Sequence, residues 1–310
     1  MNLSKDLLLK SLRAVLFGEK LDASDFAEAD WKSIFQLADE QTVSALLLDG
    51  ISLLPSECIT ISLGDKLKRI AAMQRIEQIN CLHRKVIAKI DQALKSEGIP
   101  VVFMKGQTTA LRYPNPLHRT PGDIDFVVNP KDFKKTMEVL EKIGKVDHNL
   151  VHEHHGMAWV DGVTVEPHYK VHNYQSPSTD HAMQEMFASV FPSELSSADM
   201  DGYAVPVFPP TFESVFLISH MVNHVYEEGL GLRQVIDYAM FLSSCADKID
   251  WLQHHEYLHQ MHMERAWRIF TCICVDYLGM PLPTQVESFS HQRRMLVHIK
   301  VHGRSNEDWC

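Results

Sequence analysis

The N-terminal third of the chain has apolar residues spaced three or four positions apart, the period of a helix with one buried face. One such stripe includes Leu8 and Leu12, and the longest runs over residues 66–96. Gly98 follows the stripe over residues 66–96, at a position where a glycine with positive φ can end a helix. The pattern therefore predicts an N-terminal helical segment over residues 1–97.

The pattern changes after this segment, where short apolar and alternating runs replace the helical spacing. Residues 99–104 are almost all apolar, which is typical of a buried strand, and 123–128 form a second predicted strand. The runs 157–160 and 163–166 alternate and flank an Asp-Gly pair, the strongest short signal for a β-hairpin. We therefore expect a mixed β-sheet core over residues 98–210.

Helical spacing returns after a Pro-Pro pair at 209–210. It extends over three stretches, residues 214–226, 232–243 and 263–278. We assign residues 211–310 to a C-terminal helical segment. The predicted fold class is α+β, with a mixed β-sheet core flanked by N-terminal and C-terminal helical segments.

The composition is consistent with packed cores, because 45% of the 310 residues are hydrophobic. There is no run of apolar residues long enough for a transmembrane helix, so we expect no membrane partner. Charges interrupt the first apolar stretch at helical spacing, which predicts an amphipathic helix and not a signal peptide. The six cysteines show no CxxC pair and no disulfide spacing, so we expect reduced thiols and a cytoplasmic location.

Acidic residues outnumber basic ones, 40 against 30, and the formal net charge is -10. A general nucleic-acid binder usually carries a basic face, so RNA and DNA are disfavoured as partners. A local cluster of cations can still bind the phosphates of a nucleotide, and the charge therefore leaves a nucleotide ligand open.

Histidine is frequent, with 18 residues, and raises the question of a metal site. His220 and His224 lie one turn apart on a predicted helix, but the glutamate of a HExxH motif is missing between them. We interpret both as pocket or structural residues. His152, His154 and His155 precede the predicted hairpin, where one of them can orient a carboxylate or contact a substrate.

A pair of acidic residues gives the clearest candidate chemistry. Asp123 and Asp125 are two positions apart on a predicted strand, so their carboxylates project to the same face. Such a pair repels unless a cation lies between the two groups, and oxygen ligands favour Mg²⁺ or Mn²⁺ over Zn²⁺. Glu166 stands with His168 on the polar face of the predicted hairpin and is the third candidate ligand.

These motifs follow one another in a set order: strand, Gly turn, helix, Asp-x-Asp strand and a later carboxylate strand. The stretch VVFMKGQTTALRYPNPLHRTPGDIDFVV holds the first four, VTVEPHYKV the fifth, and SHMVNHVYEEGLGLRQVIDYAMFL follows in the helical part. With this text the chain resembles the uncharacterised bacterial nucleotidyltransferase family of the DNA polymerase β-like nucleotidyltransferase superfamily. The resemblance covers residues 30–285.

The resemblance implies the parts of a catalytic site. Asp123, Asp125 and Glu166 match the catalytic carboxylates that hold Mg²⁺ or Mn²⁺. Gly106 matches the turn glycine that lets backbone amides approach a triphosphate, and Gln107 stands where the superfamily usually has serine. An NTP is the implied co-substrate, with ATP as the first candidate.

Further residues around these motifs are candidates for binding the nucleotide. Lys105 and Arg119 flank the Gly turn and the Asp pair, and Lys170 is in phase with Glu166. The helical part that the resemblance places over the site adds three candidates, His220, His224 and Arg233.

The resulting hypothesis is a Mg²⁺-dependent nucleotidyltransferase that moves a nucleoside monophosphate from an NTP to a hydroxyl acceptor and releases pyrophosphate. The acceptor is a small molecule or a protein side chain. Two alternatives stay open. The histidines can serve a metal-dependent hydrolase, or the departures at Gln107 and Pro167 can leave a nucleotide-binding or interaction module with little turnover.

Overall fold

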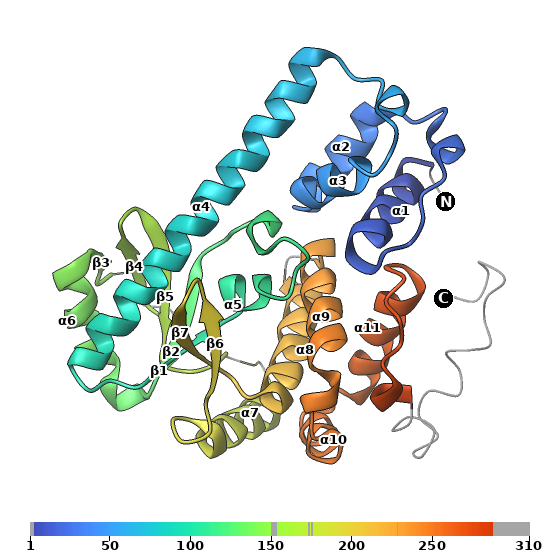
Figure 1. The fold of residues 1–310 in the computed structure, drawn as a ribbon. Coiled ribbons are helices and arrows are strands. Elements are labelled where there is room, and N and C mark those ends of the chain that lie inside the picture. The colour runs from blue at the N-terminus through green and yellow to red at the C-terminus, as the bar shows by residue number, and fades with distance from the viewer. Residues whose placement is uncertain (1–2, 150–153, 173, 175, 228, 288–310) are drawn as a thin grey trace.

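The computed structural model describes residues 3–149, 154–172, 174, 176–227 and 229–287 (Figure 1). A seven-stranded mixed β-sheet carries helices on both faces, and further helices gather beside it. This arrangement confirms the predicted α+β class.

Four α-helices precede the sheet, in the segment where the apolar spacing predicts helical structure. They are α1 (Leu3–Phe17), α2 (Trp31–Glu40), α3 (Ser44–Ile51) and α4 (Leu63–Ser96). Ser62 caps α4, because its hydroxyl accepts a hydrogen bond from the amide of Asp65 near the helix start. Gly98, with positive φ, follows the end of α4 and turns the chain into the sheet.

The seven strands form one sheet in the order β3-β4-β5-β2-β1-β7-β6. Their bounds are β1 (Val101–Met104), β2 (Ile124–Val128), β3 (Lys145–Asp147), β4 (Met157–Val160), β5 (Val163–His168), β6 (Ser196–Met200) and β7 (Tyr203–Val207). Strand β2 runs parallel to β5, and β1 runs parallel to β7, whereas the other neighbours are antiparallel.

The remaining α-helices connect the strands or follow them. They are α5 (Gly106–Ala110), α6 (Phe133–Ile143), α7 (Pro177–Val190), α8 (Pro210–Glu227), α9 (Leu232–Cys245), α10 (Trp251–Gln260) and α11 (Glu264–Asp276). Short 3₁₀ helices are η1 (Ala23–Phe26), η2 (Ser56–Cys58), η3 (Pro116–His118), η4 (Pro130–Asp132) and η5 (Ala246–Lys248).

Two Asp-Gly turns join neighbouring strands. Asp161-Gly162 joins β4 to β5, as predicted, and both residues have the positive φ that tight hairpins need. Asp201-Gly202 joins β6 to β7 in the same way, although neither strand was predicted. Strand β3 is also missing from the prediction. Strands β3 and β6 are edge strands of mostly polar sequence, so the apolar pattern does not reveal them.

One face of the sheet is covered by α4 and α6. Phe103 in β1 and Phe126 in β2 lie on this face, with ring centroids 5.6 Å apart. Val86 and Ile90, from the second half of α4, are buried in the same hydrophobic cluster. The end of the predicted N-terminal segment therefore packs directly against the sheet.

The opposite face carries Val102 and Val127, which join a larger hydrophobic cluster with α7, α8 and α9. Phe208 and Phe212 continue this cluster from the end of β7 into α8, with ring centroids 4.5 Å apart. The apolar side chains thus divide between two cores, one on each side of the sheet.

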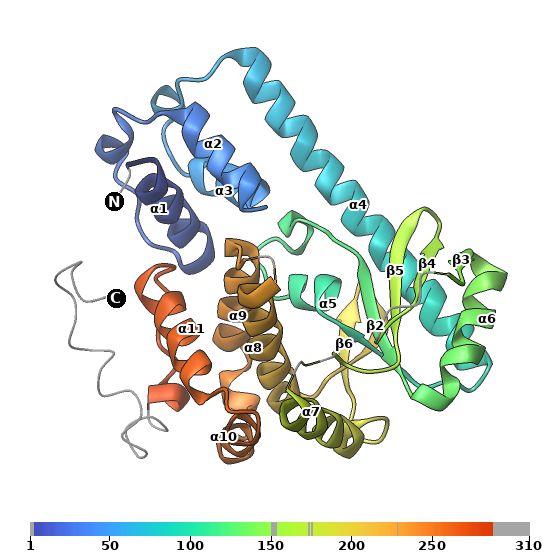
Figure 2. The same ribbon diagram turned by 180° about the vertical axis from the view of Figure 1, so that it is seen from behind.

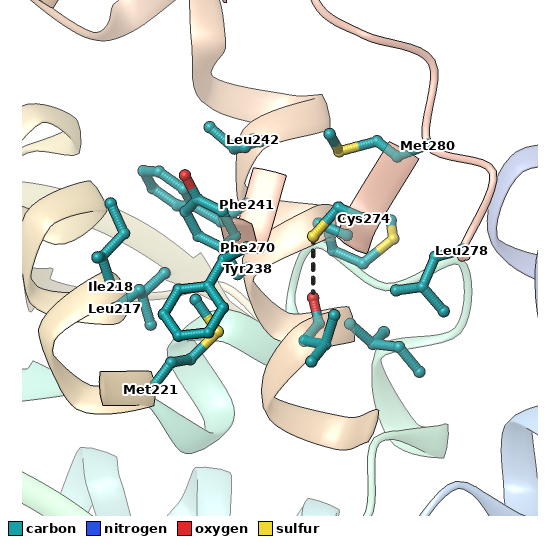
Figure 3. Close-up of a cluster of buried hydrophobic side chains, with 14 of the residues drawn as sticks. Leu217, Ile218, Met221, Tyr238, Phe241, Leu242, Phe270, Cys274, Leu278 and Met280 are labelled. Carbon is teal, nitrogen blue, oxygen red and sulfur yellow. Dashed lines mark hydrogen bonds between the residues drawn. The ribbon is translucent and has the colours of Figure 1, made fainter. Parts of the chain in front are cut away.

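The N-terminal and C-terminal helices lie together, because α1 sits beside α11 in both ribbon views (Figures 1 and 2). Arg13 in α1 donates hydrogen bonds to the backbone carbonyls of Tyr277 at 2.9 Å and Asp276 at 3.1 Å. Figure 3 shows the apolar packing between α8, α9 and α11, where the Cys274 thiol donates a weak hydrogen bond to the Val235 carbonyl at 3.7 Å. Helices α1 and α11, from the two segments that flank the core in sequence, therefore lie together in space.

Among the helices in the described residues, none combines the length and the apolar content that crossing a bilayer requires.

Candidate active site

The predicted carboxylates meet where β1, β2 and β5 lie side by side. Asp125 in β2 pairs in register with Glu166 in parallel β5 and with Met104 in antiparallel β1. Asp123 directly precedes β2, which begins one residue later than predicted. All three carboxylates line one pocket of about 200 Å³ between the sheet and helices α8 and α9.

Asp125 is the most tightly held of the three acids. Its Oδ1 accepts a hydrogen bond from His168 Nε2 at 3.0 Å and lies 3.3 Å from Lys105 Nζ. Burial opposes ionisation of this side chain, but the charge of Lys105 and the His168 hydrogen bond outweigh it and hold the pKa of Asp125 below its usual range. Asp125 is therefore ionised and fixed in place.

The other two carboxylates, Asp123 and Glu166, have raised pKa values because negative charges lie close together here and because both are partly buried. The charge of Asp125, together with burial, raises the pKa of Asp123. Burial and the two aspartates raise the pKa of Glu166 to about 7. Asp125, Glu166 and His168 each offer a ligand atom within 4.8 Å of the others. An acidic cluster of this kind fits a divalent cation, which would relieve the repulsion.

The turn after β1 brings a lysine and a glycine to the Asp pair. Lys105 has φ 55° and ψ -155°, a backbone conformation that residues other than glycine rarely adopt. Gly106 also has positive φ, and a Cβ atom there would lie 3.5 Å from the carbonyl oxygen of Asp123. This unusual backbone places the Lys105 ammonium in the pocket.

Gln107 does not line this pocket, although it was predicted to bind the nucleotide. It is 3% exposed, and its amide donates to Asn80 Oδ1 in α4 at 2.6 Å. Asn80 in turn donates to the backbone carbonyls of Leu117 at 2.6 Å and Arg119 at 2.9 Å. Gln107 therefore links the turn after β1 to α4, and through Asn80 to the segment before β2.

The two predicted arginines both lie in the pocket wall, but they differ in the partners that their guanidinium groups have. Arg119 donates from Nε and Nη2 to the two carboxylate oxygens of Asp237, each at 2.8 Å. Burial disfavours the charge, yet Asp237 raises the pKa of Arg119. Arg233 donates only a 3.4 Å bond to the Thr120 carbonyl, and its buried Nε has no hydrogen-bond partner among the described residues. Arg233 therefore has hydrogen-bonding capacity left for a ligand.

Helix α8 supplies the two predicted histidines to the same pocket. His220 and His224 face each other with their Nε2 atoms 3.1 Å apart, so one ring donates a hydrogen bond to the other. Burial, with Lys105 nearby, lowers the pKa of His220 well below its usual value. This pairing supports their interpretation as pocket residues, because the two facing nitrogens bind each other.

Lys170 lies apart from these groups. Its ammonium is 3.6 Å from the Asp180 carboxylate, and the residue is not part of the pocket wall. The strand that would keep Lys170 in phase with Glu166 ends at His168.

His168 is a candidate site residue that the sequence prediction did not include. It is 3% exposed and contacts Asp125 directly, and it stands two residues after Glu166, on the same strand face. That alternation was visible in the sequence. His154 and His155 also lie here, with ring centroids 5.4 Å and 5.0 Å from that of His168. His152 falls outside the described residues.

Comparisons with known proteins place the chain among nucleotidyltransferases. Its fold is similar to the solution structure of the antibiotic-resistance factor ANT(2'')-Ia, with 14% identity over 60% of this chain and 97% of that chain and a TM-score of 0.41. It is also similar to an antigenic nucleotidyltransferase-like protein from Paracoccidioides brasiliensis, with 13% identity, 60% and 91% coverage and a TM-score of 0.37. No curated protein matches. The model of the uncharacterised nucleotidyltransferase family matches residues 27–279, and the chain belongs to that family.

Proposed function

We propose that the pocket binds a Mg²⁺-NTP complex, with ATP as the first candidate, and that the chain transfers the nucleoside monophosphate to a hydroxyl acceptor. The observation that carries this proposal is the meeting of opposite charges in one pocket. Asp123, Asp125 and Glu166 form its acidic wall, while Lys105 and Arg233 provide cations beside it. Membership of a nucleotidyltransferase family supports the same chemistry.

The acidic wall suits Mg²⁺ or Mn²⁺ because these ions prefer oxygen ligands. Asp123, Asp125 and Glu166 would hold the ion. A bound divalent ion in such a site supplies positive charge for the triphosphate and lowers the pKa of an attacking hydroxyl. The upward shifts in the pKa of Asp123 and Glu166 support this assignment, because they reflect repulsion that a cation would remove.

In the proposed reaction, the acceptor oxygen forms a bond to the α-phosphorus while the bond to the β-phosphate oxygen breaks. Pyrophosphate leaves, and the hydroxyl proton must pass to a base. Glu166 suits that role by position, because its carboxylate lies in the wall of the same pocket. Lys105 and Arg233 are placed to offset the charge of the phosphates.

His168 and Arg119 act in this proposal through other residues. The His168 hydrogen bond and the Lys105 ammonium hold the Asp125 carboxylate, so Asp125 keeps its charge and orientation. Arg119 is already paired with Asp237, which makes it a support for the pocket wall beside Arg233 and not the main phosphate ligand.

Calorimetric titration with each of the four NTPs, with and without Mg²⁺, tests the binding. We expect at least one NTP to bind only when Mg²⁺ is present, and Asp123→Asn/Asp125→Asn to bind it at least about 10-fold more weakly. Glu138→Gln/Glu141→Gln is the matched control, because it removes two exposed acids on α6, across the sheet from the pocket. Absence of binding by any NTP, or equal binding by the aspartate variant, contradicts the proposal.

Transfer itself is tested by incubating the chain with an α-labelled NTP and panels of hydroxyl compounds or proteins. We expect label to appear on an acceptor together with released pyrophosphate. Tight Mg²⁺-NTP binding without label transfer to any acceptor would instead favour a nucleotide-binding module. The histidine-based hydrolase has less support, because His220 and His224 bind each other.

A further inference from the structure

Three imidazoles beside the carboxylates have no role in the proposed transfer as a group. His154, His155 and His168 each offer one ring nitrogen, and these nitrogens all lie within 4.8 Å of one another. The ring centroids are 4.5 Å apart for His154 and His155, 5.0 Å for His155 and His168, and 5.4 Å for His154 and His168. Three nitrogen donors therefore converge on a space of the size that one metal ion takes.

The backbone fixes this convergence. His155 forms a β-bridge with His168, and the amide of Gly156 donates to the Pro167 carbonyl at 2.9 Å. The amide of Tyr169 donates to the His154 carbonyl at 3.0 Å. The segment with His154 and His155 thus runs beside the end of β5, so the three rings are positioned before any ligand binds.

The hydrogen bonding of His168 points to a ligand on its other nitrogen. Because the Asp125 carboxylate accepts from Nε2, the neutral form of the His168 ring has its lone pair on Nδ1. Nδ1 is buried and has no hydrogen-bond partner among the described residues, in a side chain that is 3% exposed. A carboxylate behind one nitrogen and a free lone pair on the other is the usual arrangement of a metal-bound histidine.

A carboxylate also stands behind a second ring. His155 Nε2 lies 3.7 Å from Glu166 Oε2, so two of the three imidazoles have an acid on one side. Imidazole nitrogens suit Zn²⁺ and similar transition ions, whereas Mg²⁺ prefers the oxygen ligands of the neighbouring site. The two sets of donors therefore differ in the ion they select.

We infer that His154, His155 and His168 form a second metal site, which takes Zn²⁺ or a similar transition ion and leaves a fourth coordination position open. This site is separate from the Mg²⁺-NTP site and does not depend on nucleotidyl transfer. Its link to that site is His168, which would bind the transition ion through Nδ1 while it holds Asp125 through Nε2. An ion on the imidazoles would therefore also fix the orientation of Asp125.

The test is a Zn²⁺ titration of the full chain in excess Mg²⁺, repeated with Co²⁺, whose visible spectrum reports nitrogen coordination. We expect one Zn²⁺ to bind per chain. In His154→Asn and His155→Asn the affinity should fall by more than about 100-fold, because even losing an outer partner of a metal ligand costs about 10- to 100-fold. His181→Asn, an exposed histidine on α7, should bind like the wild type.

Folding and site identity are checked in the same set of proteins. The thermal midpoint in chelator shows whether each variant is folded, and added Zn²⁺ should raise it for the wild type but not for the folded His154 or His155 variants. Wild type that fails to bind Zn²⁺, or folded histidine variants that bind it as tightly as the wild type, would overturn the inference. So would loss of Zn²⁺ in Asp123→Asn alone, since that places the ion on the acidic wall. The NTP titration is read separately and is unaffected by these outcomes.

Discussion

The two faces of β2 hold opposite kinds of side chain. Toward α4 and α6 the strand presents Ile124 and Phe126, which are buried among apolar groups. Toward α8 it presents Asp125, with Asp123 just before the strand, in the wall of the pocket. Because side chains alternate along a strand, one short stretch of sequence serves a hydrophobic core and an acidic site at once.

This contrast shows how the fold sets the spacing of the acids. Asp125 faces Glu166 only because β2 and β5 pair in one register, and Phe126 and Val165 anchor that register by their burial. A slip by one residue would turn the carboxylates into the core and the apolar residues into the pocket. The apolar face therefore positions the functional face.

The largest effect is expected from removing an anchor on the apolar face. Phe126 is fully buried and packs against Phe103. Phe126→Ala should lower the free energy of unfolding by about 3–5 kcal/mol, from lost burial and the cavity it leaves. Denaturant unfolding measures this. Asp125→Asn is the paired variant on the other face and should cost less stability while it weakens Mg²⁺-NTP binding. If Asp125→Asn lowers the free energy of unfolding as much as Phe126→Ala does, the division into a stabilising apolar face and a functional acidic face is contradicted.

A smaller effect is expected from the cations on the pocket side. Arg233→Ala should weaken Mg²⁺-NTP binding by about 10- to 100-fold, the scale of one hydrogen bond between charged groups. Lys170→Ala removes the same charge outside the pocket wall and should leave affinity nearly unchanged, since Lys170 pairs with Asp180. Titration calorimetry compares the two, and equal losses would contradict the pocket assignment.

Variants of Gln107 test the polar contacts that support the pocket. Gln107→Ala leaves the buried Asn80 amide oxygen without its donor, which should cost about 1–3 kcal/mol of stability. Gln107→Glu keeps the size but removes the donated hydrogen, so it should also destabilise. Thermal and denaturant unfolding measure both variants. If neither variant is destabilised, Gln107 has no such supporting role.

The smallest effect is expected at His118, the last residue of η3, directly before Arg119. Its Nδ1 lies 2.6 Å from Asp49 in α3 and its Nε2 lies 2.8 Å from Glu77 in α4. Burial opposes the charge, but hydrogen bonds to these two acids raise the pKa of His118 above 6.5. Protonated His118 therefore adds stability at pH values below 6.5, and this contribution is lost as the pH rises through the higher pKa of the folded state.

The thermal midpoint of wild type minus that of His118→Gln should consequently be largest in mild acid and shrink toward alkaline pH. His259→Gln is the control, because His259 pairs with Glu264 at 2.7 Å on the surface, where ion pairs contribute little. A difference that is flat with pH would contradict the role of the His118 charge.

Much of the fold follows from short-range patterns. Apolar spacing predicts α4, and the Asp-Gly pair predicts the β4-β5 hairpin, because helix period and turn chemistry are local properties. Strand β6 lacks an apolar pattern and gains its place only by pairing with β7. The joining of the N-terminal and C-terminal helices rests on contacts such as Arg13 with the carbonyl of Tyr277, which no local pattern encodes.

In the candidate site, too, some features are predictable from local sequence and others depend on the tertiary fold. The same-side placement of Asp123 and Asp125 is predictable from strand alternation, and the meeting with Glu166 follows once β5 pairs beside β2. The inward turn of Gln107 depends on Asn80, a partner far away in the chain on α4. The pairing of Arg119 with Asp237 likewise needs the tertiary fold.

The most direct test of the central claim is a crystal structure with Mn²⁺ and an NTP analogue that resists cleavage between the α- and β-phosphates. The anomalous signal of Mn²⁺ locates the ion independently of the side chains. We predict an ion held by Asp123, Asp125 and Glu166, with the phosphates beside Lys105 and Arg233. An ion or triphosphate bound elsewhere, with this pocket filled only by solvent, would contradict the account.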